Sequence, residues 1–333
     1  MATGTTHTTA GSDWGKADFE AIYNCPDPRQ YFTTLQPLDY QIPHHGQAVF
    51  RTLADALRGL RPDRAPLKVL DLCCSYGVNA ALLNHRLDLT DLYARYAPPS
   101  APDGAAPEPG STATSGPAPA SAPSVSSGSS GSSRPAPIPN ANGLGPRQLA
   151  DSDRGFYAGR RREHAVRMVG LDAAHRAVEY AREVGLLEAG FAENLEVDEP
   201  TGGLRRTVRD TDLITVTGGV GYISELTFDR LLGCMPSPPW VAAFVLRTVS
   251  YEPVTALLTK AGLQTEKITA RTFRQRRFAD AGERQAAFGA LAAHGVDVEG
   301  TETDGFYHAD LYLSRPAADV AALPLERLLP DVV

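Results

Sequence analysis

The amino-acid sequence predicts an α/β fold in which a mostly parallel sheet carries helices on both faces and a small helical cap precedes it. Short apolar runs alternate with stretches of helical periodicity along most of the chain, as expected for repeated strand–helix–strand units. The first two apolar runs each end in an acid, Asp71 and Asp172. Because such sheets bind ligands at the carboxyl ends of their strands, both acids mark the candidate site.

The composition is that of one catalytic domain with extensions. The chain has 333 residues, of which 42% are hydrophobic, and a formal net charge of −7, which argues against a nucleic-acid partner. No signal peptide and no apolar run near the roughly 20 residues of a membrane span is found, so a cytoplasmic protein without a membrane partner is expected. No metal site is predicted, because the cysteines lack a zinc-binding spacing: Cys25, Cys73, Cys74 and Cys234.

The N-terminal part divides into a tail and an aromatic cap. Residues 1–12 are rich in Thr, Gly and Ala and are predicted to be disordered. Residues 13–46 are aromatic, and four prolines in them exclude one long helix: Pro26, Pro28, Pro37 and Pro43. We interpret this segment as a lid over the site; the alternative is that its aromatic side chains only pack the cap onto the sheet.

Two residues of the cap are candidates for chemistry. Tyr31 combines an apolar ring with a polar tip, which suits a residue that faces a substrate. His44 is a candidate base. Since adjacent histidines point apart, at most one of His44 and His45 serves a given site, and surface exposure is the alternative for both.

The core begins after the cap. Residues 47–60 have helical spacing, and Lys68–Leu72 (KVLDL) reads as a buried parallel strand. The small residues 73–77 predict a tight turn into a helix that starts at Val78 and runs to Tyr96, with a break or cap at residues 88–91.

A long segment of low complexity interrupts the core. Residues 97–147 are dominated by Pro, Ala, Ser and Gly and predict a disordered insertion in a surface loop. The core therefore comprises residues 47–96 and 148–316, and residues 317–333 form a C-terminal tail.

Six further strands complete the predicted sheet. They are expected at residues 166–172, 190–197, 212–222, 240–249, 263–268 and 306–314, with the last antiparallel. The fourth strand leaves through Thr217 and Gly218 toward Tyr222, where glycines permit close approach of a ligand; the alternative is a plain turn. The basic segment 272–278 is predicted to be a solvated face.

The stretch from Asp71 to Gly77 (DLCCSYG) resembles motif I of the class I S-adenosylmethionine-dependent methyltransferases, and Asp172 occupies the position of their ribose-binding acid. In that family glycines follow the first acid at alternate positions, which here hold Cys73, Ser75 and Gly77. The resemblance implies a Rossmann-like fold with seven strands, an N-terminal lid and S-adenosylmethionine as cofactor. The cofactor-binding residues it implies are Asp71, Cys73, Ser75, Tyr76, Gly77, Asn79, Asp172, Glu193, Asn194, Thr217 and Gly218, and the candidate catalytic residues are Tyr222, Tyr31 and His44.

The implied function is methyl transfer to a small molecule, in specialised metabolism. Aromatic faces stabilise a sulfonium cation, and candidates are Tyr23, Tyr31, Tyr76 and Tyr222. A weaker resemblance leads to methyltransferase-like azetidine-2-carboxylate synthases, which convert the cofactor alone into that amino acid and methylthioadenosine. A third possibility is a non-catalytic cofactor-binding module. A dehydrogenase is disfavoured because the sequence lacks G-x-G-x-x-G.

Overall fold

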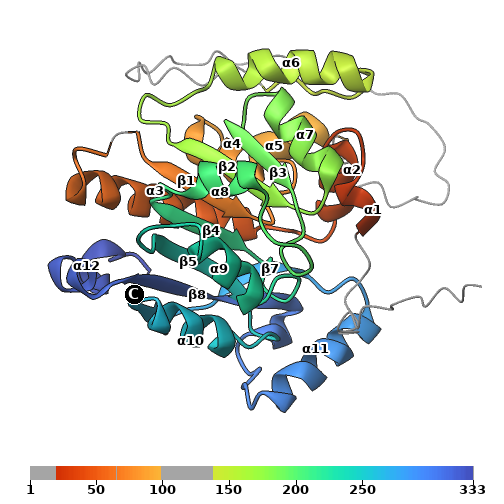
Figure 1. Ribbon diagram of the computed structural model, residues 1–333. Coiled ribbons are helices and arrows are strands. Elements are labelled where there is room, and N and C mark those ends of the chain that lie inside the picture. Colours follow the sequence, from red (N-terminus) through yellow and green to blue (C-terminus); the bar gives the residue numbers. More distant parts are fainter. Residues whose placement is uncertain (1–19, 65, 99–137, 333) are drawn as a thin grey trace, which may run out of the picture.

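A computed structural model describes residues 20–64, 66–98 and 138–332 of the chain. Its strands form one sheet in the order β3-β2-β1-β4-β5-β8-β6, with β7 paired to β8 (Figure 1). The strands are β1 Lys68–Leu72, β2 Arg167–Asp172, β3 Ala189–Ala192, β4 Leu213–Thr217, β5 Trp240–Leu246, β6 Leu263–Lys267, β7 Phe273–Arg277 and β8 Phe306–Pro316. The first five are parallel, whereas β8 runs antiparallel to its neighbours, so the predicted fold class is confirmed.

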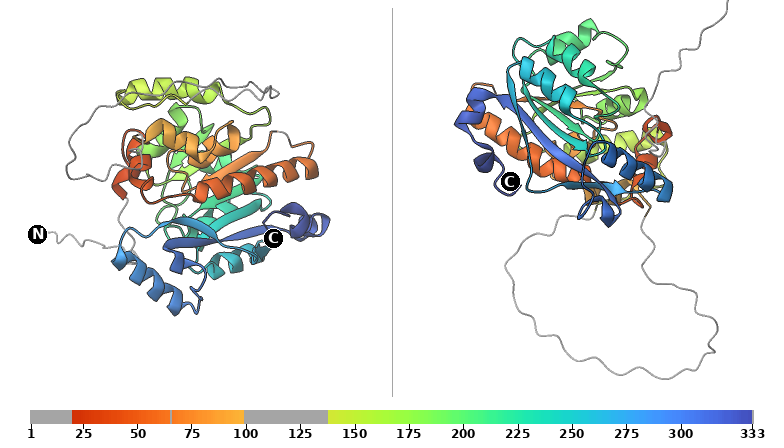
Figure 2. Two further views of the ribbon diagram at one scale, coloured as in Figure 1. Left: turned by 180° about the vertical axis from the view of Figure 1, so that it is seen from behind. Right: turned by 90° about the horizontal axis from the view of Figure 1, so that it is seen from below.

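Helices cover both faces of this sheet (Figures 1 and 2). They are α1 Glu20–Tyr23, α2 Arg29–Leu35, α3 Ile42–Leu60, α4 Val78–Asn84, α5 Leu89–Tyr96, α6 Pro146–Ala158, α7 His175–Glu183, α8 Gly202–Val208, α9 Glu225–Leu232, α10 Glu252–Lys260, α11 Ala281–Ala293, α12 Ala317–Ala322 and α13 Leu325–Leu328, with a 3₁₀ turn η1 at Glu302–Asp304. Helices α3–α7 line one apolar core and α8–α10 the other. No helix within the described ranges has the length and apolar character needed to cross a bilayer.

Successive side chains along a strand point to opposite faces of the sheet, so each strand contributes to both apolar cores. In β1, Val69 belongs to the core under α3, whereas Leu70 and Leu72 belong to the core under α8–α10. In β4, Leu213 and Ile214 divide in the same way. Every residue of β1 is buried, as expected for a central parallel strand.

The strand order reverses at β1. The chain moves from β1 outward to β2 and β3, and then returns to place β4 and β5 on the other side. Connections that leave in opposite directions open a crevice at the carboxyl ends of β1 and β4, which is where ligands bind in open α/β sheets.

The cap folds back onto the turn that follows β1. The Tyr76 hydroxyl lies within hydrogen-bond distance of the backbone oxygens of Ile22 (2.9 Å) and Cys25 (3.0 Å), which share its one proton. In α2, Phe32 stacks on Tyr96 of α5 with ring centroids 5.0 Å apart. The predicted tail at residues 1–12 and the first part of the cap lie outside the described residues.

Several predicted segments differ from the structure. The helix expected from residue 47 begins at Ile42, and the strands expected at 212–222 and 240–249 end at Thr217 and Leu246. Most of the predicted insertion 97–147 lies outside the described residues, but from residue 138 the chain packs on α5, where Asn140 Nδ2 donates to Ala94 O, and α6 already begins at Pro146. The expected third strand, 190–197, ends at Ala192 because residues 193–197 turn. Segment 272–278, expected to be a solvated face, forms β7, since its alternate residues Phe273 and Gln275 are buried. The predicted tail contains α12 and α13, and Leu325 and Leu328 of α13 are buried.

A buried ion pair fixes α6 to α5. Arg95 and Asp153 pair with side chains that are 1% and 0% exposed, and the hydroxyls of Tyr96 and Tyr180 also donate to Asp153. Burial raises the pKa of the Asp153 carboxyl, which the hydrogen bonds from Tyr180 and Arg95 oppose. Breaking such a pair leaves an uncompensated charge inside the protein.

We therefore expect Asp153→Ala to lower the free energy of unfolding by about 3–5 kcal/mol, because Arg95 then stays buried without a counter-ion. The matched control is Asp151→Ala on the same helix, whose carboxylate is 72% exposed and pairs with exposed Arg154. That change should cost less than about 1 kcal/mol. Urea unfolding of both variants measures the difference, and equal losses would contradict this role of Asp153.

Candidate functional site

The turn after β1 holds three residues in the left-handed region of backbone space. Cys73, Ser75 and Gly77 have φ values of 55°, 49° and 76°. Only glycine adopts this region without cost, and another residue there is destabilised by roughly 1–2 kcal/mol. The turn therefore has the backbone geometry of a glycine-rich loop although two of its three special positions carry side chains. Such strain is typical of functional sites.

Asp71, at the end of β1, is the centre of a buried polar network. Its Oδ1 accepts hydrogen bonds from Asn79 Nδ2 (2.9 Å) and Thr215 Oγ1 (2.7 Å), and Asn79 also donates to Thr217 Oγ1 (3.0 Å). Its Oδ2 is buried and has no partner among the described residues. Burial raises the pKa of the Asp71 carboxyl to about 7, with the two hydrogen bonds opposing the rise.

Asp172, at the end of β2, forms a hydrogen bond with the turn that follows the neighbouring strand β1. Its Oδ2 accepts from the backbone N–H of Ser75 at 2.8 Å, and its Oδ1 accepts from the N–H of Ala174 at 2.9 Å. Burial raises the pKa of this carboxyl, and these backbone hydrogen bonds lower it in part. Each carboxylate oxygen has a second lone pair, so Asp172 retains acceptor capacity for a ligand.

The loop after β4 approaches this turn closely. A Cβ on Gly219 would lie 2.6 Å from Cys73 Sγ, so the Cys73 side chain occupies space that glycine leaves open. Gly218 has φ 70°, and a Cβ there would lie 2.5 Å from Gln275 Nε2. The two glycines of this loop thus make room for side chains from the β1 turn and from β7.

Tyrosines from the cap and from the loop after β4 surround the same region. Burial raises the pKa of Tyr23, to which the nearby Tyr40, Tyr222 and Asp172 also contribute. Burial raises the pKa of Tyr40 to about 12, and Asp71 and Tyr222 lie within electrostatic range of it. Tyr222 is 65% exposed, which places it at the rim.

The structure places several predicted site residues in other roles. Tyr31 is 4% exposed and packs among the rings of the cap, including Tyr40 and Tyr76 at centroid distances of 6.2 and 5.9 Å. Tyr76 anchors the cap through its hydroxyl. His44 is exposed, whereas the ring of His45 packs on Phe273.

The two predicted cofactor-binding residues after β3, Glu193 and Asn194, form hydrogen bonds to nearby residues of the chain. Glu193 accepts hydrogen bonds from the N–H (3.0 Å) and hydroxyl (2.7 Å) of Thr201, the N-cap of α8. Asn194 is exposed, and its Oδ1 accepts from the N–H of Glu196 at 3.0 Å. These contacts shape the loop after β3.

Unpartnered polar atoms gather around the carboxyl ends of β1 and β4. Eight buried side-chain nitrogen or oxygen atoms lack a hydrogen-bond partner within the described part of the chain. Four of them belong to this region: His45 Nε2, Asp71 Oδ2, Ser75 Oγ and Gln275 Oε1. Since buried polar groups are almost always paired, such a cluster indicates a ligand that supplies the missing partners.

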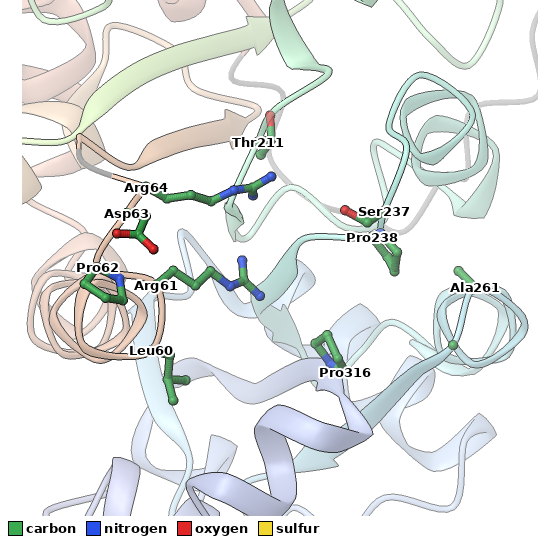
Figure 3. A pocket seen from close by; sticks show the side chains of 11 residues that line it. Leu60, Arg61, Pro62, Asp63, Arg64, Thr211, Ser237, Pro238, Ala261 and Pro316 are labelled. Carbon is green, nitrogen blue, oxygen red and sulfur yellow. The ribbon is translucent and has the colours of Figure 1, made fainter.

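Cavities lie at both ends of the strands. One of about 170 Å³ is lined by residues 220–225 and by Glu196, Val249 and Pro253 among others, so it adjoins Tyr222. Another, of about 670 Å³, lies at the opposite end of the strands, where Arg61 and Arg64 line it (Figure 3). Both arginines are already paired with Asp212. We place the candidate site at the carboxyl ends, because the unpartnered carboxylate and the left-handed turn lie there.

No group of three or more His, Cys, Asp or Glu side chains in the described ranges is arranged to hold a metal ion.

Sequence reasoning missed Thr215 and Gln275. Thr215 had a usable signal, because the parallel register pairs Asp71 with Thr215 and directs both side chains to one face. Gln275 had no comparable signal, since β7 is a short strand rich in arginine.

No family model matches the chain, and no curated protein sequence matches it. Among solved structures, the plantazolicin methyltransferase BpumL in complex with SAH aligns with 89% of this chain and 93% of its own, at 9% identity and a TM-score of 0.39. A TehB-like SAM-dependent methyltransferase from Corynebacterium glutamicum aligns over 77% and 85%, at 10% identity and 0.32. The cyclase SpnF aligns over 80% of both chains, at 11% and 0.33. These similarities are weak, so the fold assignment rests on the strand order and register.

The raised pKa of Asp71 predicts a specific dependence of stability on pH. Its pKa of about 7 in the folded protein lies above the ordinary 3.8, so the folded protein holds this proton longer than the unfolded chain. The contribution of Asp71 to the free energy of unfolding therefore falls as pH rises from about 4 to about 7. Asp71→Asn removes this contribution. The difference in free energy of unfolding, variant minus wild type, should therefore be larger at pH 8 than at pH 4 by about 2–4 kcal/mol.

Chemical unfolding at the two pH values measures this difference, and Asp229→Asn, an exposed position on α9, is the control. The same pH dependence in wild type and Asp71→Asn would show that Asp71 ionises in the folded protein without cost.

Proposed function

We propose that this protein is an S-adenosylmethionine-dependent methyltransferase that acts on a small molecule. The observation that carries the proposal is the half-paired carboxylate of Asp71, buried beneath a turn with three left-handed residues at the point where the strand order reverses. Asp172, at the end of the neighbouring strand, supplies the second anchor.

The residues present fit this cofactor. Asp71 Oδ2 is the buried acceptor that an ammonium group, such as that of the methionine moiety, would satisfy. Asp172 is held in one orientation by two backbone N–H groups and retains lone pairs for the ribose hydroxyls. Gly218 and Gly219 allow the chain to approach from the β4 side.

When bound, the cofactor supplies a methyl group on a positively charged sulfur. The protein contributes chiefly by alignment, because attack on that carbon requires the nucleophile, the carbon and the sulfur to lie in line. Tyr23 lies within electrostatic range of Asp172, and Tyr40 within electrostatic range of Asp71. Aromatic rings in this region can stabilise a neighbouring cation. The cap, anchored through Tyr76, excludes water from this region.

The enclosure of the site supports a small acceptor, such as a molecule of specialised metabolism. Tyr31 and Phe32 of the cap are nearly inaccessible, and the cavity beside Tyr222 has a volume of only about 170 Å³. A protein or nucleic-acid acceptor would need an open groove toward the carboxyl ends of β1 and β4.

The same enclosure favours one second candidate. In an azetidine-2-carboxylate synthase the amino group of the cofactor attacks its own γ-carbon, so no acceptor has to enter. A cap that is held to the turn after β1 through the Tyr76 hydroxyl suits that reaction as well.

Incubation with S-adenosylmethionine, alone and with a metabolite extract, tests the proposal. Mass spectrometry should detect S-adenosylhomocysteine and a product heavier by one methylene unit, and only when the extract is present. Asp172→Ala should reduce turnover by on the order of tenfold or more, as expected for a lost hydrogen bond to a charged group, whereas Asp229→Ala should not.

Methylthioadenosine formed from the cofactor alone, above its spontaneous background, would contradict methyl transfer and support the azetidine-2-carboxylate synthase reaction instead. Absence of both nucleosides, together with tight binding of NAD, would exclude both candidates.

A further inference from the structure

Strand β7 pairs with the first part of β8, which lies beside the carboxyl end of β5. Phe273 packs edge-on against Phe244 of β5 with ring centroids 5.0 Å apart. The backbone oxygen of Gln275 accepts a hydrogen bond from the N–H of Gln41, the residue before α3, at 2.7 Å. The Gln275 side chain reaches Gly218 in the loop after β4. Thus β7 joins the start of α3 to the loop beside Asp71.

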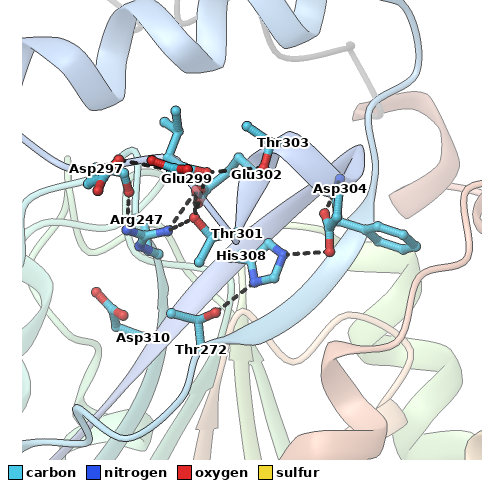
Figure 4. A network of polar contacts seen from close by, with 12 residues as sticks. Arg247, Thr272, Asp297, Glu299, Thr301, Glu302, Thr303, Asp304, His308 and Asp310 are labelled. Atoms are coloured by element: carbon cyan, nitrogen blue, oxygen red, sulfur yellow. Dashed lines mark hydrogen bonds and ion pairs between the residues drawn. The ribbon is translucent and has the colours of Figure 1, made fainter.

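The neighbours of Gln275 are held by polar partners. The Thr272 hydroxyl and His308 Nδ1 are 2.7 Å apart, and Arg274 Nε donates to Asp304 Oδ2 at 2.8 Å. His308 Nε2 also contacts Asp304 Oδ2, at 3.2 Å (Figure 4). Arg276 forms a buried two-point ion pair with Glu283, at 2.9 and 2.6 Å. These contacts fix the strand before any ligand arrives.

A second set of contacts fixes the loop that precedes β8. Arg247, directly after β5, pairs with Glu302 at 2.6 Å and donates to the backbone oxygen of Asp297 at 2.6 Å (Figure 4). Thr301 also donates to Glu302, at 2.7 Å. Since β7 is paired to β8, this network holds the whole edge in one place.

Gln275 differs from these neighbours. It is 4% exposed, and its Oε1 is buried without a partner among the described residues. Its amide packs against Gly218, where a Cβ would lie only 2.5 Å from Nε2. A buried amide oxygen without a hydrogen-bond partner costs free energy unless a ligand pairs with it. Since this oxygen is carried by a fixed strand next to the end of β4, it has the properties of a group that recognises a ligand.

Two ionisable side chains near Gln275 contribute no net charge at pH 7. Arg276 is neutralised by Glu283. His45, whose Nε2 is also unpartnered, stays neutral at pH 7 because burial lowers its pKa to about 4. Tyr40, within electrostatic range of Arg276 and Asp71, adds an aromatic ring. This side of the site therefore suits an uncharged, planar molecule.

We infer that Gln275 recognises the methyl acceptor, and that the acceptor is an uncharged aromatic molecule whose N–H or O–H group donates a hydrogen bond to the Gln275 amide oxygen. This inference rests on the proposed function and names the substrate class for it. It assigns a specificity role to β7.

The test uses pairs of small probes in which methylation removes this donor: phenol and anisole, aniline and N,N-dimethylaniline, pyrrole and 1-methylpyrrole. Saturation-transfer NMR on the full chain with S-adenosylhomocysteine present measures their binding. At least one donor-bearing probe should bind roughly fivefold or more tightly than its methylated partner, the scale of one hydrogen bond. Gln275→Leu should abolish that preference, and Gln275→Glu, which retains an acceptor oxygen, should keep it.

Gln264→Leu, at an exposed position on β6, is the control and should behave as wild type. A preference that survives in Gln275→Leu, or the absence of any preference in wild type, would overturn the inference. Calorimetry with S-adenosylhomocysteine separates this failure from that of the proposed function, because loss of the acceptor contact leaves cofactor binding intact.

Discussion

The site depends on one carboxylate that the fold buries and pairs on one side only. Asp71 lies in the middle of the sheet because β1 is its central parallel strand, and the Thr215 and Asn79 side chains satisfy one of its oxygens. The other oxygen has no partner in the described chain. Burying a carboxylate in this state costs free energy, so the arrangement is best understood as preparation for a ligand with a positively charged donor.

The turn above Asp71 shows how the same backbone can be built from different residues. Cys73 and Ser75 adopt left-handed conformations that glycine normally supplies, and the side chain at Cys73 fills space toward the next loop. That loop compensates, because Gly219 has no Cβ to collide with the thiol. The space that glycines would leave open in the turn after β1 is thus provided by the glycine in the loop after β4. A search for a fixed glycine pattern in the first turn alone would overlook this arrangement.

The sequence predicted the strands and the positions of Asp71 and Asp172 well, because buried parallel strands are continuous apolar runs and the acids end them. The sequence did not predict the features that depend on tertiary contacts. β7 reads as a basic surface, yet Arg276 is buried because Glu283 neutralises it. His44 and His45 are indistinguishable in sequence, and only the packing on Phe273 selects the inner one. Thr201, eight residues away, determines what Glu193 binds.

The most direct test of this account is a crystal structure of the protein with S-adenosylhomocysteine. The account predicts the amino group of the ligand within hydrogen-bond distance of Asp71 Oδ2 and its ribose hydroxyls beside Asp172. Density for the ligand in the cavity lined by Arg61 and Arg64, with Asp71 Oδ2 still unpartnered, would contradict it.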